Sequence, residues 1–275
     1  MSFTARRLTP QGLAPVAYRA SSLADATQHE PDGIYTTAST QERFQVLKLS
    51  QHLARLYDSA EREGIAFTLP VERIREGLRQ LIEEAGYENT RFRITVPYTN
   101  PNEPILSAEP FAGHPAALYE KGIRVVTAKN SARHNPGAKD TAWMRDRRHI
   151  ESQLPDEVYT AILLDGDGNL LEGTSSNFYA VLGGKLHTAQ EGVLAGIAQQ
   201  IVLEVAPRVL PVVREPVNIA DLPHLQEAFI TSSSRGVMPV VQIDQQVLGD
   251  GTPGKHTQDI QQAYLAWMLE NAESL

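Results

Sequence analysis

Apolar residues recur at helical spacing in several stretches of the chain, three and four positions apart, and these stretches predict amphipathic helices. The clearest of them cover residues 51–63 and 68–85, and further helices are predicted over residues 142–153, 197–206 and 257–270. Ser50 is placed to cap the first of them, because a serine side chain can accept a hydrogen bond from a free N–H group of the first turn. Gly86 is expected to end the second, because glycine readily adopts the left-handed conformation that closes a helix.

Shorter runs of β-branched and aromatic residues, bounded by turn residues, predict strands. They cover residues 34–37, 44–49, 92–96, 123–127, 159–164, 178–182, 185–188 and 228–231. The acidic segment 165–169 is expected to be a hairpin turn, because a calcium loop would need a glutamate at its twelfth position and flanking helices. Residues 1–30 are polar and show no clear period. Hairpins alternating with helices favour an α+β fold over a doubly wound parallel sheet.

The length of 275 residues suggests about two domains. Prolines are concentrated between Pro97 and Pro115, and such a segment continues a helix or a strand poorly. The sequence therefore predicts a small α+β domain over residues 1–112, a linker over 113–121 and a larger α+β domain over 122–275.

Composition narrows the classes of function. Hydrophobic residues make up 41% of the chain, enough for a sizeable core. The net charge of -8 argues against a nucleic-acid binder, which needs a basic surface. Neither a secretory signal nor a membrane span is expected, which predicts a cytoplasmic protein. The absence of cysteine excludes disulfides, thiolate metal sites and a cysteine nucleophile, and no metal site is predicted.

Four places in the second half of the chain combine polar groups with tight backbone. Lys139 follows a Pro-Gly turn, Glu172 ends an apolar strand, Gly196 opens a helix and residues 231–234 form a hydroxyl-rich loop. Each alone is compatible with an ordinary surface or loop position. Together they provide a Schiff-base lysine, a partner for a pyridine nitrogen and two halves of a phosphate seat. One phosphorylated pyridine aldehyde would use all four.

At this point the sequence resembles a known family, the class IV aminotransferases, which are fold-type IV pyridoxal-phosphate enzymes. They include branched-chain and D-amino-acid aminotransferases and aminodeoxychorismate lyase. The resemblance is carried by residues 32–37, 52–56, 133–139, 172–179 and 194–197, in the family's order. It implies a two-domain α+β architecture, a homodimer and pyridoxal 5'-phosphate as cofactor.

The resemblance also implies a role for each matching position. Lys139 would be the catalytic lysine that binds the cofactor covalently and moves the proton. Glu172 would pair with the pyridine nitrogen, and Arg55 would bind the phosphate. Ile197 and Ala198, through their N–H groups, and Ser233 and Ser234 would hold the remaining phosphate oxygens. Tyr35 would line the substrate pocket, and Arg93 is a candidate for the substrate carboxylate.

The predicted activity is transamination between a small amino acid, of the branched-chain or D class, and a 2-oxo acid. One alternative is a lyase that releases pyruvate from aminodeoxychorismate with the same cofactor. A second is a binding module that keeps the fold without catalysis. A third is a serine hydrolase acting through Ser175 or Ser233, which ranks last because no Gly-x-Ser-x-Gly elbow is present.

Overall fold

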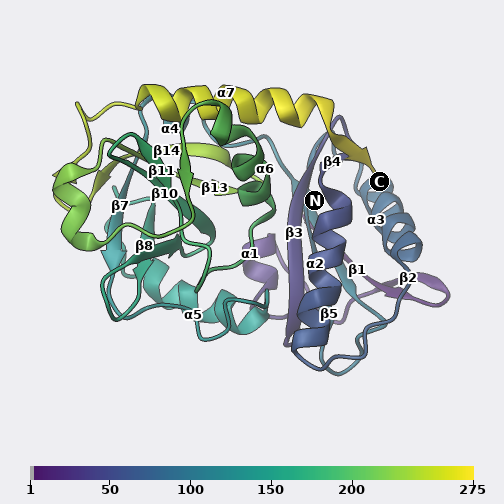
Figure 1. Ribbon diagram of the computed structural model, residues 1–275. Coiled ribbons are helices and arrows are strands. Elements are labelled where there is room, and N and C mark those ends of the chain that lie inside the picture. The colour runs from purple at the N-terminus through teal and green to yellow at the C-terminus, as the bar shows by residue number, and fades with distance from the viewer. Residues whose placement is uncertain (1–2) are drawn as a thin grey trace. The chain divides into compact units, whose positions relative to one another are not determined.

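The computed structural model describes residues 3–275, which form two compact units (Figure 1). Unit 1 comprises the described residues up to Ala112 together with Ala138–Arg145 and Asn271–Leu275. Unit 2 comprises Gly113–Gly137 and Asp146–Glu270. The predicted division also has a boundary after residue 112, but it assigns residues 138–145 and 271–275 to the second domain. The segment expected as a linker, residues 113–121, belongs to unit 2 and contains the short helix α4 (Ala117–Glu120).

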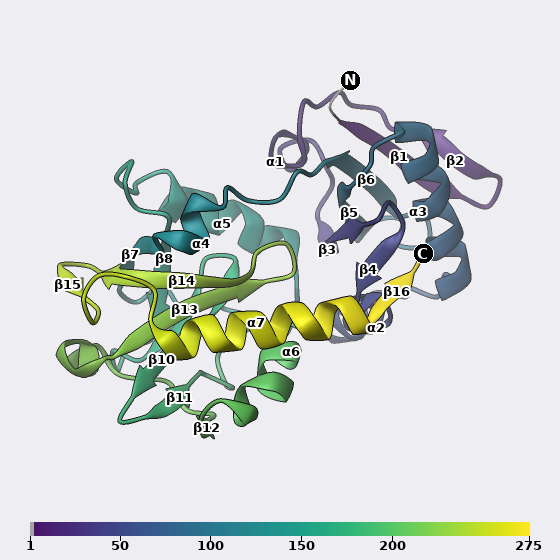
Figure 2. The ribbon, with the colours of Figure 1, turned by 90° about the horizontal axis from the view of Figure 1, so that it is seen from above.

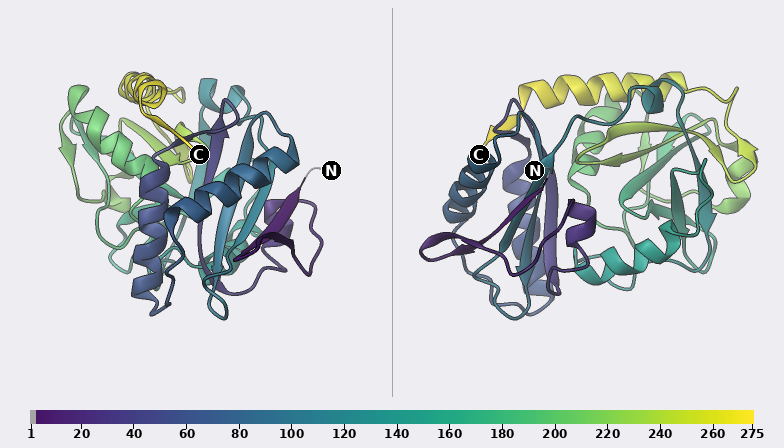
Figure 3. Two further views of the ribbon diagram at one scale, coloured as in Figure 1. Left: turned by 90° about the vertical axis from the view of Figure 1, so that its right-hand side faces the viewer. Right: turned by 180° about the vertical axis from the view of Figure 1, so that it is seen from behind.

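Unit 1 is built on a seven-stranded antiparallel sheet with the strand order β16-β4-β3-β5-β6-β1-β2. Its strands are β1 (Thr4–Thr9), β2 (Gly12–Pro15), β3 (Gly33–Gln41), β4 (Gln45–Leu47), β5 (Thr90–Pro97), β6 (Ile105–Pro110) and β16 (Ala272–Ser274). Its helices are α1 (Leu23–Ala26), α2 (Leu49–Arg62) and α3 (Val71–Ala85). The long helices α2 and α3 cover the same face of the sheet, as the left view of Figure 3 shows.

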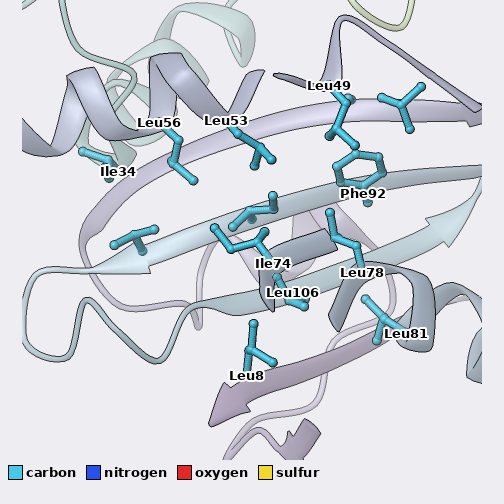
Figure 4. Packing of buried hydrophobic residues seen from close by; sticks show 14 of the residues in the cluster. Leu8, Ile34, Leu49, Leu53, Leu56, Ile74, Leu78, Leu81, Phe92 and Leu106 are labelled. Atoms are coloured by element: carbon cyan, nitrogen blue, oxygen red, sulfur yellow. The ribbon is translucent and has the colours of Figure 1, made fainter. Parts of the chain in front are cut away.

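The core of unit 1 lies between those two helices and the sheet (Figure 4). Leucines and isoleucines at helical spacing point to the sheet, whose alternate residues point back at them. The buried side chains are Leu49, Leu53 and Leu56 of α2, Ile74, Leu78 and Leu81 of α3, and Leu8, Ile34, Phe92 and Leu106 of the sheet. Each such side chain contributes roughly 1.5–3 kcal/mol to stability. This burial confirms the two helices predicted from apolar spacing.

The start of α2 differs from the prediction. Ser50 lies inside the helix, and Lys48, which precedes the helix, has a φ of 45° and makes no side-chain capping bond. The Ser50 hydroxyl instead donates to the Glu273 carboxylate at 2.6 Å. By contrast, Gly86 ends α3 at a φ of 69°, as predicted.

Three strand regions of unit 1 are missing from the predicted strands: the β1–β2 hairpin, β6 and the C-terminal β16. Residues 1–30 contain the β1–β2 hairpin, in which only Ala5 and Leu8 are buried along β1. Strand β6 lies within the proline-rich segment and pairs with β5. It forms because Pro104 precedes the strand and Pro110 is its last residue, so neither interrupts the ladder.

Unit 2 contains a nine-stranded sheet that closes on itself. The order is β12-β11-β10-β13-β14-β7-β8-β9, β15 pairs with β14, and β9 also pairs with β10. Six strands therefore form a ring. The strands are β7 (Ile123–Ala128), β8 (Thr160–Leu164), β9 (Leu170–Gly173), β10 (Ser176–Leu182), β11 (Lys185–His187), β12 (Val212–Val213), β13 (Glu227–Ser232), β14 (Gly236–Ile243) and β15 (Gln246–Val247).

Helices α6 (Ile197–Val205) and α7 (Lys255–Glu270) pack against the face of that ring that carries Tyr179. Helix α5 (Thr141–Glu151) begins in unit 1 and continues into unit 2. Figure 2 shows α7 running alongside β13 and β14. Side chains alternate between the two faces along β10. Phe178 packs into a hydrophobic cluster to which all six ring strands contribute, whereas Tyr179 packs against α6 and α7. The residues 165–169 form the predicted turn between the antiparallel strands β8 and β9. The predicted α+β character is thus present in both units.

Among residues 3–275, no helix combines the length and apolar character needed to cross a bilayer.

Candidate functional site

The lysine predicted to carry the chemistry lies on a short segment of unit 1 that runs beside β3. The carbonyl of Lys139 accepts the N–H of Tyr35 at 2.8 Å, and Ile34 and Asp140 form an antiparallel bridge. The Lys139 N–H donates to Ser59 Oγ at 3.3 Å. These bonds fix the backbone on both sides of the side chain. The Lys139 Nζ lies 4.6 Å from the centroid of the buried Tyr35 ring.

The residue after the lysine starts a helix. Asp140 Oδ1 accepts the N–H of Trp143 at 2.8 Å, which is the capping bond expected at the start of α5. Thr141 Oγ1 accepts the N–H of Gly33 at 3.0 Å. The lysine therefore lies between a backbone segment that is hydrogen-bonded to β3 and the first turn of α5.

Arg55, the predicted phosphate ligand, is on α2 of the same unit. Its Nη2 donates to Thr36 Oγ1 at 3.4 Å, and Thr36 Oγ1 lies 2.9 Å from Nδ1 of His52. His52 is fully buried. Burial, and then the charges of Arg55 and Lys139, hold the pKa of His52 well below its usual 6.5. The ring is neutral at physiological pH.

Arg93, the predicted substrate ligand, is buried in unit 1 and engaged by other residues. Its Nη2 lies 2.9 Å from Oε1 of Glu30, and both side chains are at most 5% exposed. Its Nη1 donates to the carbonyl of Leu23 and to Thr27 Oγ1, each at 3.0 Å. Glu30 also accepts from Thr95 and Ser107 on the sheet. The arginine thus joins the segment around α1 to the sheet.

Glu172, the predicted partner of a pyridine nitrogen, is the last residue but one of β9 in unit 2 and is 4% exposed. Its Oε2 accepts the N–H of Leu194 at 3.2 Å. Its Oε1 lies 3.8 Å from Nη1 of Arg133, whose side chain is 4% exposed. Burying a carboxylate is costly unless it is hydrogen-bonded and paired with a positive charge, and these two contacts supply a donor and a positive partner.

The loop before α6 is fastened to β10 by Asn177. The Asn177 Nδ2 donates to the carbonyl of Leu194 at 2.9 Å, so both polar groups of the Leu194 backbone are bonded, one to Asn177 and one to Glu172. A Cβ on Gly196 would lie 1.9 Å from Asn177 Oδ1, so only glycine allows this approach. Gly196 has no side chain to cap α6, and the N–H groups of Ile197 and Ala198 belong to its first turn.

The two serines predicted to complete the phosphate seat lie in the turn between β13 and β14. Asn177 pairs with Thr231 on β13, and Ser233 and Ser234 follow two and three residues later. The pairing of β10 with β13 therefore places this turn beside one end of β10. At that same end, Asn177 contacts Gly196. Arg235 secures the turn, because its guanidinium donates to Ser175 Oγ and to Ser232 Oγ.

The structure thus brings Lys139, Tyr35 and Arg55 into unit 1, and Glu172, Ile197, Ala198, Ser233 and Ser234 into unit 2. Four supporting residues were not assigned a role from sequence: Thr36, His52, Arg133 and Asn177. All four lie within or beside the motif segments, but a motif match alone does not show which neighbours make contact. Within residues 3–275, no group of three or more histidine, aspartate or glutamate side chains is arranged to hold a metal ion.

Comparison with known proteins points in the same direction as the site residues. The family described as "Amino-transferase class IV" matches residues 33–243. The D-alanine aminotransferase of Bacillus licheniformis is 27% identical over 245 residues, which cover 84% of this chain and 86% of that protein.

Two solved structures share the fold. A T.th. branched-chain amino acid aminotransferase with pyridoxamine 5'-phosphate has a TM-score of 0.83 at 19% identity, covering 98% of this chain and 95% of that one. The 4-amino-4-deoxychorismate lyase of Pseudomonas aeruginosa has a TM-score of 0.71 at 22% identity, covering 90% of this chain and 94% of that one. These similarities confirm the predicted α+β fold of the fold-type IV enzymes.

Proposed function

Because the chain belongs to the class IV aminotransferases, we propose that it moves an amino group between a small amino acid and a 2-oxo acid with pyridoxal 5'-phosphate. The amino acid is of the branched-chain or D class, which is the range that the names of its relatives span. The observation that carries the proposal is the buried Glu172 carboxylate, bonded to the N–H of Leu194 on the loop that leads to the first turn of α6.

The chain's residues fit this cofactor chemically. A fixed carboxylate matches a protonated pyridine nitrogen. The N–H groups of Ile197 and Ala198 at a helix start, with the hydroxyls of Ser233 and Ser234, match phosphate oxygens. Arg55 adds a charge-assisted donor for the phosphate. A side chain at position 196 would collide with Asn177, and glycine leaves the entry to α6 open.

When bound, the cofactor supplies an electron sink that stabilises negative charge on the substrate Cα. Lys139 would link to it and then carry the proton from the Cα through its released amine. The bonds to Tyr35 and Ser59 fix the lysine backbone, so that only the side chain moves during that transfer. The ring of Tyr35 gives the amine an aromatic neighbour, which would also line the substrate pocket.

Covalent labelling tests the assignment of the lysine. Borohydride reduction of the protein with pyridoxal 5'-phosphate should leave the cofactor mass on the peptide that contains Lys139. Lys139→Ala should lose both the label and turnover while keeping the wild-type circular dichroism spectrum. Lys129→Ala, at an exposed lysine with no assigned role, should keep both. Transamination by Lys139→Ala at the wild-type rate would refute the assignment.

Dependence on an acceptor separates a transaminase from a lyase. The purified protein should release a 2-oxo acid from an amino acid only when a second 2-oxo acid is present. Release of pyruvate from aminodeoxychorismate without any acceptor would favour the lyase. We further propose a homodimer, as the family resemblance implies, and light scattering on the eluting peak of a sizing column measures its mass.

A further inference from the structure

The histidine on α2 is unusual because its ring is polar, fully buried and close to two cations. His52 is 0% exposed and sits among the leucines that α2 turns toward the sheet. Its Nε2 has no hydrogen-bond partner among residues 3–275. A polar nitrogen without a partner in a core is costly, and an apolar side chain would avoid that cost. The reason for an imidazole at this position must therefore lie with its other nitrogen.

Hydrogen-bond capacity limits the contacts at that nitrogen to two directions, and one of them links His52 to Arg55 through Thr36. Arg55 can only donate, so Thr36 Oγ1 accepts from it. The single hydroxyl proton of Thr36 is then free to be donated to Nδ1 of His52, 2.9 Å away. Nδ1 can accept it only if the ring is neutral and carries its proton on Nε2. In this tautomer the chain of donors runs from Arg55 to Thr36 to His52.

We propose that His52 is a positioning residue, which acts through Thr36 to hold the Arg55 guanidinium in place for the cofactor phosphate. The inference rests on the proposed function, since it takes Arg55 as a phosphate ligand. Protonation of the ring would reverse the role of Nδ1 from acceptor to donor, so that the Thr36 hydroxyl proton would lose its acceptor on His52. It would also place a third positive charge near Arg55, on the same helix, and Lys139, beside β3. The anchor therefore works only with a neutral imidazole.

Three variants separate this role from simple packing. His52→Asn puts an amide oxygen near the place of Nδ1, so it keeps an acceptor for Thr36 and never titrates. His52→Leu removes the acceptor but keeps an apolar core. Thr36→Val removes the middle of the chain and leaves the histidine intact. Arg55→Met serves as the reference for complete loss of the phosphate contact.

The measurement is the ratio of dissociation constants for pyridoxal and pyridoxal 5'-phosphate, obtained by equilibrium dialysis. Both compounds carry the aldehyde, so the ratio isolates the contribution of the phosphate. At pH 8, His52→Leu and Thr36→Val should lower the ratio by about tenfold, the size of one lost anchored contact. His52→Asn should stay within about twofold of wild type at pH 8, because it keeps an acceptor for the Thr36 hydroxyl.

The outcomes distinguish the inference from the function on which it rests. A wild-type ratio in His52→Leu and Thr36→Val, with a lowered ratio in Arg55→Met, would overturn the role of His52 and leave the function standing. An unchanged ratio in Arg55→Met, or no binding of pyridoxal 5'-phosphate by the wild type, would refute the proposed function itself. Wild-type circular dichroism spectra for Thr36→Val and His52→Asn exclude misfolding as the cause of a changed ratio.

Discussion

The neutral, buried histidine makes the stability of unit 1 depend on pH in a defined way. The folded state holds the pKa of His52 well below 6.5, whereas the unfolded chain leaves it at 6.5. Below that value the unfolded state binds a proton that the folded state refuses, so stability must rise with pH. The contribution of the neutral His52 to the free energy of unfolding is complete above about pH 7. It is lost as the pH falls through 6.5 toward the pKa of the folded state. His52→Asn should abolish this loss.

The size of the effect follows from the distance between the working pH and 6.5. At pH 5 the unfolded histidine is 1.5 pH units below its pKa. If the folded ring is still neutral there, the free energy of unfolding falls by about 2 kcal/mol relative to pH 7.5. Such a change is large against the 5–15 kcal/mol by which native proteins are typically stable.

Tryptophan fluorescence gives an assay that reports on unit 1. The chain has two tryptophans, Trp143 in unit 1 and Trp267 in unit 2. In a Trp267→Phe background, urea unfolding followed through Trp143 gives the free energy of unfolding at pH 7.5 and pH 5. The loss between the two pH values should be about 2 kcal/mol smaller in His52→Asn than in its parent. The exposed His224 provides the control, since His224→Asn should leave the loss unchanged.

An equal loss on acidification in His52→Asn and in its parent would show that the buried ring protonates as readily as a free one. That result would refute the reasoning from burial and neighbouring charge. It would also remove the basis for a neutral acceptor at Nδ1.

Two further substitutions test other parts of the site. Gly196→Ala should weaken binding of pyridoxal 5'-phosphate at least tenfold, because the new Cβ would lie 1.9 Å from Asn177 Oδ1. Adding Asn177→Ala should recover part of that loss. Full affinity in the single variant would contradict the packing argument. Arg93→Met should lower the free energy of unfolding by about 3–5 kcal/mol in urea, because it strands the buried Glu30 carboxylate. A stable Arg93→Met with a raised KM would instead support a substrate contact.

The fold was predictable where hydrophobic spacing was regular. Helices α2 and α3 and strand β10 bury a continuous stripe or face, and that leaves a clear period in the sequence. Strand β1 does not, because only Ala5 and Leu8 are buried in it and they are three positions apart. Strand β6 was hidden by the prolines that bound it. The cap at Ser50 was wrong because the chain turns into α2 through a left-handed Lys48 instead.

The sequence predicts the residues that would bind the cofactor, but not the residues that hold those side chains in place. Lys139 and Glu172 stand in motifs whose residue types point to a pyridine aldehyde. The contact between Glu172 and Arg133 joins residues 39 positions apart, and that between Asn177 and the Leu194 backbone spans 17. Only tertiary structure brings them together. His52 was visible within the Arg55 motif, but the direction of its hydrogen bond depends on Thr36, a residue from a neighbouring strand.

The way unit 1 is assembled from separate stretches of chain has a consequence for its synthesis. Strand β16 completes the sheet by pairing with β4, yet 125 residues of unit 2 are made between Arg145 and Asn271. At ribosomal rates of about 5–20 residues per second, the outer edge of β4 waits roughly 6–25 s for its partner after Arg145 has been made. During that interval the nascent protein carries an open strand edge, which is the kind of surface that other chains can join. Translation speed through unit 2 therefore sets how long unit 1 is exposed to mispairing.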